Sequence, residues 1–223
     1  MPIPNREQHE QRLARLLSRY FGDQRRRIAE ILLDTPDLDK ITPAQWSEYE
    51  SRLALLMEPE FEDLFILGEL DLEDALRYSL DPILTGNAAS EFAVRYSGTF
   101  AQGITQTSQN RLSAVMRRYF DRQLDNAWLT SQLTGIFGPV RAEMAAITEV
   151  TRVAVEGREF LARRLRNEGV ELIAIWQTRN DEMVCPICGD RHEKPQGSNW
   201  YTPPPAHPRC RCDVNYRVPE PTE

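Results

Sequence analysis

Two short motifs near the end of the chain decide how the rest is interpreted: CPIC at 185–188 and HPRCRC at 207–212. They contain all four cysteines of the 223 residues. A Cys-x2-Cys pair places two thiols on one tight turn, and structural Zn²⁺ takes four nitrogen or sulfur ligands in a closed tetrahedron. The sequence therefore predicts one structural zinc ion per chain.

The second motif offers more ligands than the site needs. Five residues are candidates for four places: Cys185, Cys188, His207, Cys210 and Cys212. The first two form the ordinary half of such a site. Which two of the remaining three complete it stays open.

The cysteines could instead form disulfides or remain as unligated thiols. Disulfides require an oxidising compartment, and the N-terminal residues 1–6 include no apolar segment that would direct the chain there. Four unligated thiols would have to cluster into two close pairs by chance. The stretch 180–216 also has few large apolar side chains, and a segment with so little core needs a cross-link to hold its shape.

Charge is distributed unevenly along the chain. The formal net charge is −7, with 27 Lys and Arg against 34 Asp and Glu, which argues against a general nucleic-acid coat protein. Residues 41–81 carry 2 basic against 11 acidic residues, whereas the segments on either side are nearly balanced. No apolar run approaches the length of a membrane span, so we expect a soluble, cytosolic protein without a membrane partner.

Apolar periodicity predicts a mainly α fold: a multi-helix body with a small, zinc-stapled β lobe at the C-terminal end, α+β overall. Helices are expected over 6–33, from Pro43 onward, and over 140–166. Residues 170–178 alternate as a strand does, and 214–218 are apolar enough to pair beside them. The expected regions are an N-terminal helical region 1–85, a central helical domain 86–169, a zinc lobe 170–218 and a tail 219–223.

Several residues are expected to interrupt helices. Pro59 lacks an amide hydrogen and should kink or end its helix. Gly68 and Gly103 should break the patterns in which they lie. Asp71 is a candidate cap for a further helix through Leu80.

The region 87–214 resembles the phage Mu F-like minor head protein family of tailed-phage head morphogenesis proteins. The likeness rests on Arg141-Ala142, Thr148-Glu149, Arg152, Trp176-x-Thr178, Asp181 and above all the segment from Pro205 to Cys212 with its His-x2-Cys-x-Cys end. The loop 189–195 departs from the family pattern. It makes His192 a rival ligand, although its closeness to Cys188 favours a surface position.

The resemblance implies a non-enzymatic minor capsid protein that acts with the portal protein in head morphogenesis and in DNA packaging or delivery. It implies a location in the host cytoplasm during assembly and in the virion afterwards. The expected partners are the portal or other capsid proteins, with weak, sequence-independent DNA contact and no small-molecule substrate.

Five residues of the matching region are expected to support the site rather than bind metal: Arg141, Glu149, Arg152, Trp176 and Asp181. Glu149 and Arg152 are spaced to pair along one helix face. They form either a solvated charge ladder or a link to the zinc lobe, with Asp181 as a candidate partner.

Two rival functions use the same residues. A metal-dependent nuclease would need histidines to hold a catalytic metal, yet the chain has only His9, His192 and His207. A zinc-ribbon nucleic-acid binder would use a basic cluster formed by Arg191, Arg209, Arg211 and Arg217, whose alternative role is to neutralise the metal-bound thiolates.

Residues 1–81 lie largely outside the likeness and are expected to dock the partner, while the zinc lobe, thought to expose little apolar area, serves as a rigid end. The acidic block 41–81 is either a solvated face or a surface for a basic partner. Chelation is expected to unfold the lobe from Trp176 onward and to leave the helices before Arg166 intact.

Overall fold

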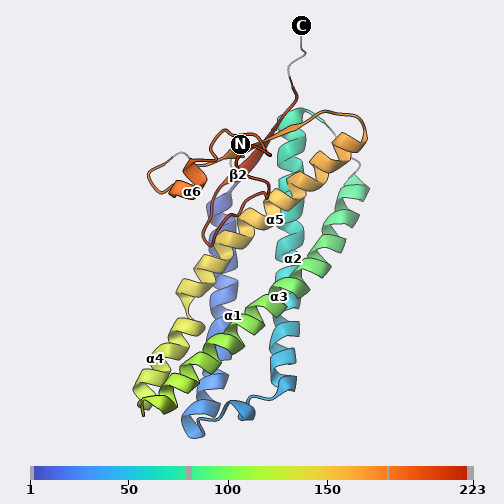
Figure 1. Ribbon diagram of the computed structural model, residues 1–223. Helices are drawn as coiled ribbons and strands as arrows, with labels where there is room; N and C mark the ends of the chain where they lie inside the picture. The colour runs from blue at the N-terminus through green and yellow to red at the C-terminus, as the bar shows by residue number, and fades with distance from the viewer. Residues whose placement is uncertain (1–2, 79–81, 180, 220–223) are drawn as a thin grey trace. The chain divides into compact units, whose positions relative to one another are not determined.

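The structure is a computed structural model that describes residues 3–78, 82–179 and 181–219. Long helices dominate it, and one two-stranded sheet lies near the C-terminal end (Figure 1). The elements in chain order are α1 (Arg6–Asp34), the 3-10 turn η1 (Leu38–Lys40), α2 (Pro43–Leu76), α3 (Pro82–Asp121), α4 (Asn126–Ile136), α5 (Pro139–Asn167), β1 (Ile173–Gln177), α6 (Pro186–Gly189) and β2 (Asp213–Arg217). The predicted fold, mainly α with a small β lobe, is confirmed.

The chain forms two compact units, and each of α1, α2, α3 and α5 contributes residues to both. Unit 1 comprises Met1–Glu10, Phe61–Phe92 and Ile147–Glu223, and unit 2 comprises Gln11–Glu60 and Ala93–Ala146. This division cuts across the ranges 1–85, 86–169 and 170–218, which follow the order of the chain. The reason is that long helices pass through both cores, so a core is assembled from separate stretches of sequence.

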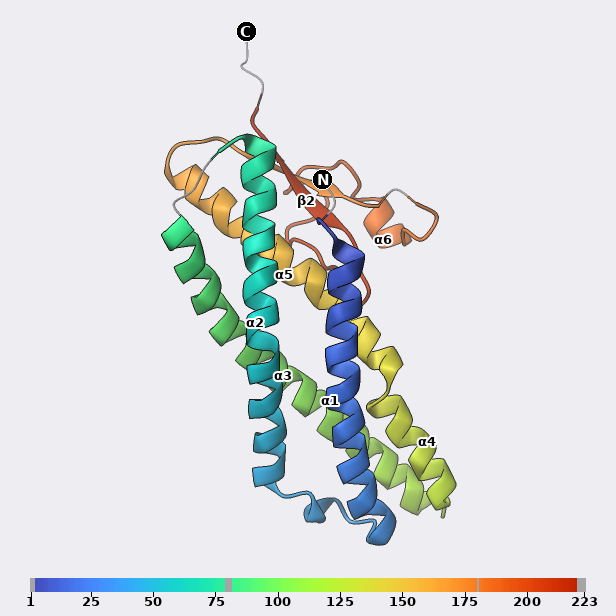
Figure 2. The same cartoon turned by 180° about the vertical axis from the view of Figure 1, so that it is seen from behind.

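Unit 2 is a helical bundle. In it α1 and the first half of α2 run side by side (Figure 2), and Tyr20 on α1 donates a hydrogen bond of 3.0 Å to the carbonyl of Tyr49 on α2. The α2 start is a capping box, since Thr42 Oγ1 accepts from the Gln45 amide at 3.2 Å and Gln45 Oε1 accepts from the Thr42 amide at 2.8 Å. The Thr42-Pro43 start signal in the sequence is thus present in the structure.

The buried Arg141 joins three helices of unit 2. Its guanidinium donates to Ser108 Oγ at 2.8 Å, to the carbonyl of Ile136 at 2.9 Å and to the carbonyl of Ile104 at 3.0 Å. The Ile136 carbonyl lies at the C-terminal end of α4, where a positive charge also interacts favourably with the helix dipole. Arg141 therefore fixes the end of α4 against α3 and α5.

Unit 1 is built on a close contact between α2 and α5. A Cβ at Gly68 would lie 2.0 Å from the carbonyl oxygen of Ala154, and one at Gly157 would lie 2.1 Å from that of Phe65. Each glycine therefore lets its helix approach the other backbone more closely than any side chain permits.

The helix breaks predicted at Gly68 and Gly103 are wrong, and Pro59 does not end its helix. The helix α2 runs through Pro59 and Gly68, and α3 runs through Gly103. Pro59 and Leu55 are both exposed, so water can satisfy the Leu55 carbonyl that loses its helical hydrogen bond. Gly68 is retained for the contact with α5, and Gly103 costs the long α3 only about 1 kcal/mol relative to alanine.

The expected helix from Asp71 is also wrong. The structure has Asp71 inside α2, which ends at Leu76, and its carboxylate pairs with the buried Arg158 of α5. The end of the expected helix, residues 79–80, and Asp81 lie outside the described residues. No described helix is both long and apolar enough to cross a bilayer.

The sheet pairs β1 and β2 antiparallel, with Ile175 opposite Asn215. The two strands match the predicted segments within a few residues. The outer edge of β2 is blocked at Val214, whose amide donates to Asp213 Oδ1 at 2.9 Å and whose carbonyl accepts from Arg158 at 3.3 Å. A side-chain block of this kind protects a sheet edge from pairing with another strand.

One buried acid in the α2–α5 contact has no compensating partner. Glu69 is fully buried, and neither of its carboxylate oxygens has a hydrogen-bond partner among the described residues. Burial, with a smaller contribution from the charge of Glu73, raises the pKa of Glu69 to about 8, and Arg164 opposes the shift. The folded protein therefore holds this carboxyl in its neutral form at pH 7.

This pKa predicts a pH-dependent stability. Because the folded pKa lies above the unfolded value of about 4.5, the contribution of Glu69 is fully present below that pH and is lost as the pH rises to about 8. Glu69→Gln should remove this loss. Between pH 4.5 and about 8, the difference in unfolding free energy between the variant and the wild type should therefore grow in favour of the variant, by up to about 1.4 kcal/mol per pH unit. Urea denaturation at several pH values measures the difference.

The exposed Glu30→Gln substitution is the matched control, and its curve should stay parallel to the wild type. Parallel curves for Glu69→Gln as well would show that the carboxyl is ionised in the folded protein.

Candidate metal centre

The first motif forms a tight turn that presents two thiols. Cys185 precedes the short helix α6, which has Pro186 at its first position. The carbonyl of Cys185 accepts from the amide of Cys188 at 3.1 Å and from that of Gly189 at 2.9 Å. Cys188 is buried and Cys185 is half-buried, so the turn points one thiol inward and leaves the other nearer the surface.

The second motif folds back on the first. The carbonyl of His207 accepts from the Cys210 amide at 3.1 Å, and Arg209 between them has φ 62, a left-handed conformation. Cys210 and Cys212 are both buried, and all four cysteines are free thiols. The turn therefore brings an imidazole and two thiols to the place where Cys188 lies.

The donor atoms form two groups that share Cys188. One holds Cys185, Cys188 and His207, the other Cys188, Cys210 and Cys212, and the donor atoms within each group lie within 4.8 Å of one another. The Sγ atoms of Cys188 and Cys210 are 3.8 Å apart. A tetrahedral ion with bonds of about 2.3 Å to sulfur separates two sulfur ligands by about 3.8 Å. The residues can therefore hold a metal ion.

His207 has the tautomer that a metal ligand requires. Its Nε2 lies 3.1 Å from Cys185 Sγ and 3.3 Å from Cys188 Sγ, while its Nδ1 lies 2.8 Å from the Pro208 carbonyl oxygen. A carbonyl only accepts, so Nδ1 carries the hydrogen and the lone pair of Nε2 faces the sulfurs. A backbone carbonyl on the second ring nitrogen is the usual way in which a ligating histidine is oriented.

The thiols oppose one another's ionisation. Burial, together with the charge of Cys210, raises the pKa of Cys188 to about 12. The hydrogen bond from Cys212 lowers the pKa of Cys210 to about 5, and the same contact raises that of Cys212. Without a cation the cluster cannot ionise as a whole, whereas a divalent ion stabilises several thiolates at once.

Threonines of α5 anchor the ligand loop 207–212. Thr148 Oγ1 accepts from the amide of Arg209 at 3.0 Å, and Thr151 Oγ1 donates to the carbonyl of Cys210 at 2.7 Å. Thr151 also accepts from Arg6 of α1 at 2.7 Å. One hydroxyl thus links the first turn of α1, the middle of α5 and the backbone of a candidate ligand.

A second link from α1 is a two-point ion pair. Glu10 accepts from Arg211 at 3.0 Å and 2.7 Å, and its side chain is only 6% exposed. Bidentate pairs between arginine and carboxylate fix orientation as well as contribute energy. The residue between Cys210 and Cys212 is therefore held by the N-terminal helix.

Buried polar contacts tie the sheet to the helices. Arg158 of α5 pairs with Asp213 at the start of β2 and with Asp71 of α2. Tyr216 of β2 donates to Glu159 of α5. Removing one partner of such a buried pair usually costs more than the pair contributes, about 3–5 kcal/mol, so the contacts specify how the lobe docks within unit 1.

The five predicted supporting residues have different surroundings. Trp176 is fully buried in the lobe, 5.3 Å from the Trp200 ring and 5.0 Å beneath the Arg191 guanidinium. Asp181 accepts from the Met183 amide at 3.1 Å and pairs with Arg179 at 3.4 Å.

The other three lie on α5. Arg152 and Glu149 pair with each other at 3.5 Å, as their spacing predicts. Arg141 belongs to unit 2 and supports the helical bundle. The rival ligand His192 lies in neither donor group, and its Nδ1 instead faces the amide of Thr178 at 3.2 Å.

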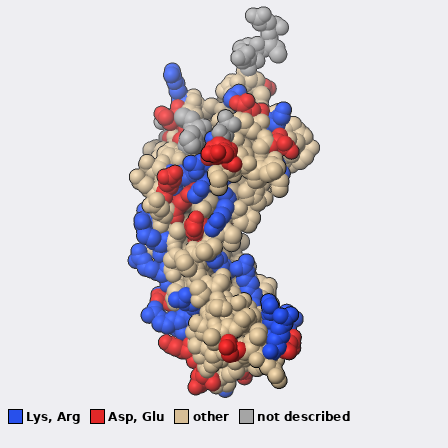
Figure 3. All heavy atoms as spheres, turned by 90° about the vertical axis from the view of Figure 1, so that its left-hand side faces the viewer, with Lys and Arg blue, Asp and Glu red and all other residues tan. Residues whose placement is uncertain are grey.

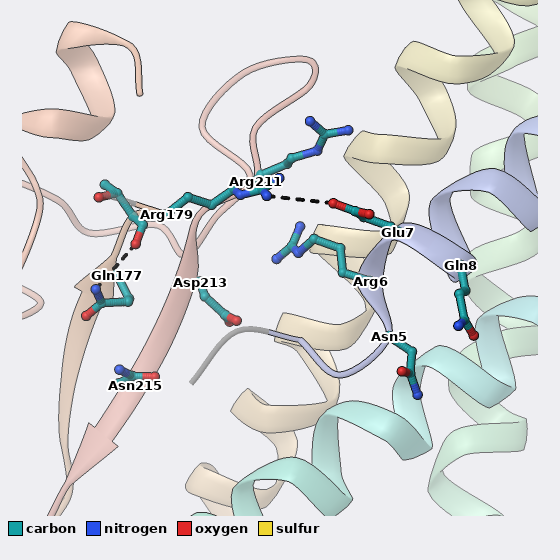
Figure 4. Close-up of a pocket in the computed structure, with 10 residues that line it drawn as sticks. Asn5, Arg6, Glu7, Gln8, Gln177, Arg179, Arg211, Asp213 and Asn215 are labelled. Carbon is teal, nitrogen blue, oxygen red and sulfur yellow. Dashed lines mark hydrogen bonds and ion pairs between the residues drawn. The ribbon is translucent and has the colours of Figure 1, made fainter. Parts of the chain in front are cut away.

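A polar pocket of about 820 Å³ lies beside the centre within unit 1. Figure 4 shows its lining side chains, which come from the start of α1, the end of β1 and the strand β2. Arg179 reaches Glu7 across it at 3.8 Å. The pocket lies between the sheet and the first turn of α1. Polar side chains such as Arg179 and Glu7 connect its two sides.

Sequence reasoning missed Arg6, Glu10, Thr151, Arg158 and Asp213. Arg158 had a detectable signal, because it falls on the α5 face that also carries Thr151, Ala154 and Leu161, where a charge needs a buried partner. Arg6 and Glu10 had none, since a charged pair at the start of an amphipathic helix is ordinary surface composition.

Comparisons with known proteins add no further information: the chain matches no family model, no curated protein and no solved structure. The function must therefore be argued from the motif residues and from the geometry of this centre.

The contacts between the ligand loop and α1 extend the expected effect of metal removal beyond the lobe. We predict that chelation exposes not only the lobe but also residues 6–10, because Arg6 and Glu10 are held by the ligand loop. Hydrogen–deuterium exchange with and without a strong chelator should show faster exchange in both segments, and slow exchange in residues 43–60 throughout.

Glu10→Gln is the companion variant. It should speed exchange at 6–10 even with metal bound and leave the lobe protected. Protection of 6–10 that survives chelation while the lobe opens would contradict the link.

Proposed function

We propose that the centre binds one structural Zn²⁺ through Cys185, Cys188, His207 and Cys210. The observation that carries this is the lone pair of His207 Nε2 facing two thiols, with Nδ1 held by a carbonyl. Three sulfurs and one imidazole nitrogen are a common structural zinc shell. Cys212 then serves beside the shell, its thiol donating to the sulfur of Cys210.

Substitutions separate this ligand set from a four-cysteine site. Cys188→Ser and His207→Ala should each leave less than about a tenth of the wild-type zinc, whereas Cys212→Ser should keep most of it and release it faster to a chelator. Elemental mass spectrometry of the purified variants measures the content. Loss of zinc in Cys212→Ser together with its retention in His207→Ala would replace the proposed set with four cysteines.

We further propose that the protein is a minor head component of a tailed phage that acts with the portal protein. The support is the run from Pro205 to Cys212, in which His207 and Cys210 face the centre and Arg211 and Arg209 hold the loop to α1 and α5. Such a protein would assemble in the host cytoplasm and enter the virion. A shell of four protein ligands leaves no open position for catalysis, which favours a non-enzymatic role.

The zinc-ribbon alternative loses part of its basic cluster. Arg211 is committed to Glu10, and Arg191 lies over the ring of Trp176. These guanidiniums stabilise the lobe from within, so the lobe offers fewer free cations to phosphates than its sequence suggests.

The expected division of labour needs one correction. The sequence predicts a lobe that exposes little apolar area, yet Met183, Ile187 and Tyr201 are 86%, 57% and 74% exposed. These three side chains are exposed apolar anchors that belong to the lobe itself. On the N-terminal helices, Leu55 and Leu70 of α2 are exposed by 72% and 50%.

Truncation is a poor test of docking, because removing residues 1–86 would delete Arg6, Glu10 and Asp71, which hold the lobe. Single substitutions avoid this. We predict that Leu55→Arg and Leu70→Arg each weaken capture of the portal protein encoded in the same genome by at least about tenfold, measured by co-expression and pull-down. Val140→Arg, at a site 68% exposed on α5, is the control and should bind as the wild type does.

Two failures can be told apart. If Met183→Arg or Tyr201→Arg abolishes capture while the α2 variants bind normally, the lobe is the docking element. If the wild type captures no portal or capsid protein, the assembly proposal itself fails.

A further inference from the structure

The helix α4 of unit 2 carries no charged residue, although 27% of the chain is charged. Its apolar residues Leu129, Leu133 and Ile136 are buried. The exposed side includes Thr130, Ser131 and Thr134. The exposed side of this helix is therefore a neutral strip of side chains that carry hydroxyl groups.

A row of arginines on α1 borders one side of this strip. Arg15, Arg19 and Arg26 are four and seven residues apart, which places them on one helix face over about 16 Å. A groove of about 680 Å³ lies between α1 and α4, lined by Arg19, Arg25 and Arg26 from one and by Thr130 and Thr134 from the other. Arg25 donates to Thr134 Oγ1 at 3.3 Å, which confirms that the two helices are in contact.

Arg15 and Arg19 differ from the arginines beside them on α1. Arg12 and Arg27 pair with Glu60 and Glu48, whereas Arg15 and Arg19 make no hydrogen bond or ion pair with the described part of the chain. A solvated helix face usually matches its charges with acids one turn away. The unmatched pair points instead to an external anion.

A second arginine row, on α3, borders the other side of α4. Arg111, Arg118 and Arg122 repeat the spacing of seven and four residues, and Arg118 lies 5.7 Å from the ring centroid of Trp128 on α4. Figure 3 shows basic side chains at both margins of the lower part of that view, with a mostly uncharged surface and a few acidic side chains between them.

The turn that joins α3 to α4 holds the second row rigidly. Gln123 has φ 51, the Leu124 amide donates to the Tyr119 carbonyl at 3.0 Å, and the Gln123 amide donates to the Phe120 carbonyl at 3.2 Å. These are the bonds of a Schellman C-cap. Asp125 then caps α4 by accepting from the Trp128 amide at 2.8 Å. The arginines are thus presented on fixed backbone.

The unit that contains the arginine rows also has the more positive net charge. Unit 2 contains 14 Lys and Arg against 12 Asp and Glu, whereas unit 1 contains 13 against 22. Unit 1 thus carries −9 and unit 2 carries +2, so the acidic excess that argues against nucleic-acid binding belongs to unit 1. Near α4 the acids are few: Asp23 is already paired with Arg26 and Arg52, and Asp125 with the start of its own helix.

From these features we propose that the α4 face, defined by α4 and its two arginine rows, binds the phosphodiester backbone of nucleic acid. Guanidiniums spaced along two ridges suit successive phosphates. The hydroxyls of Thr130, Ser131 and Thr134 donate to carbonyls of their own helix, so the strip between the ridges contributes a surface without opposing charge. A protein partner is less well served, because no large apolar side chain of α4 itself is exposed. Phe120, 55% exposed between Arg118 and Arg122, is an aromatic ring on which a base can stack. Binding should be weak and independent of sequence, and it does not depend on the zinc centre or on the portal.

The test is fluorescence anisotropy with a labelled 30-base-pair DNA duplex. The full-length protein should bind with a dissociation constant on the order of micromolar at about 50 mM salt, and log K should fall with log salt with a slope of about −4. The double variants Arg15→Ala/Arg19→Ala and Arg118→Ala/Arg122→Ala should each weaken binding by about tenfold or more and reduce the slope by about 2.

Arg95→Ala/Arg217→Ala is the matched control, because it removes the same charge from exposed positions that belong neither to α4 nor to the two arginine rows. It should bind within about twofold of the wild type. Equal weakening by all three variants would show a nonspecific effect of net charge and overturn the proposal. Absence of binding at about 50 mM salt, or displacement of the duplex by polyglutamate as readily as by unlabelled duplex, would also overturn it.

Discussion

The sulfur atoms of Cys188 and Cys210 lie 3.8 Å apart, with two further thiols and one imidazole beside them. Such a group cannot ionise as a whole without a cation, and its neutral form leaves buried thiols with weak hydrogen bonds only. The segment 178–212 has one short helix of its own and takes its remaining shape from turns. We therefore propose that an ion held by these residues is the constraint that turns this stretch of loops into a lobe, and that the strands β1 and β2 on either side depend on it.

The lobe in turn organises unit 1 through buried polar contacts. Arg158 joins α5 to α2 and β2, and Thr151 joins α5 to the ligand loop and to Arg6. These contacts lie around the tight α2–α5 crossing that Gly68 and Gly157 permit. Apolar burial stabilises the unit, whereas the polar contacts decide in which orientation the lobe docks. A change in the loop 207–212 would thus reach the start of α1 through the hydrogen bonds of Thr151 and Arg211.

The sequence was sufficient for features that depend on local pattern. The periodicity of 6–33 and 140–166 indicated α1 and α5 almost to their ends, and the two cysteine motifs indicated the centre. It was insufficient where distant residues decide the outcome. Pro59 and Gly103 look like breaks in the local sequence, yet α2 and α3 continue through them, because Pro59 is exposed to water and one glycine costs a long helix little. The partners of Arg158 lie 55 and 87 residues away, so no local pattern could reveal them. The arginine rows on α1 and α3 became one surface only because α4 lies between them.

The most direct test of the account is the metal content and coordination of the full-length protein purified without added metal. Elemental analysis should find close to one zinc per chain, and X-ray absorption at the zinc edge should show three sulfur ligands at about 2.3 Å and one nitrogen at about 2.0–2.1 Å. A protein that is folded, contains less than about a tenth of an equivalent of any metal and has four titratable thiols would contradict it.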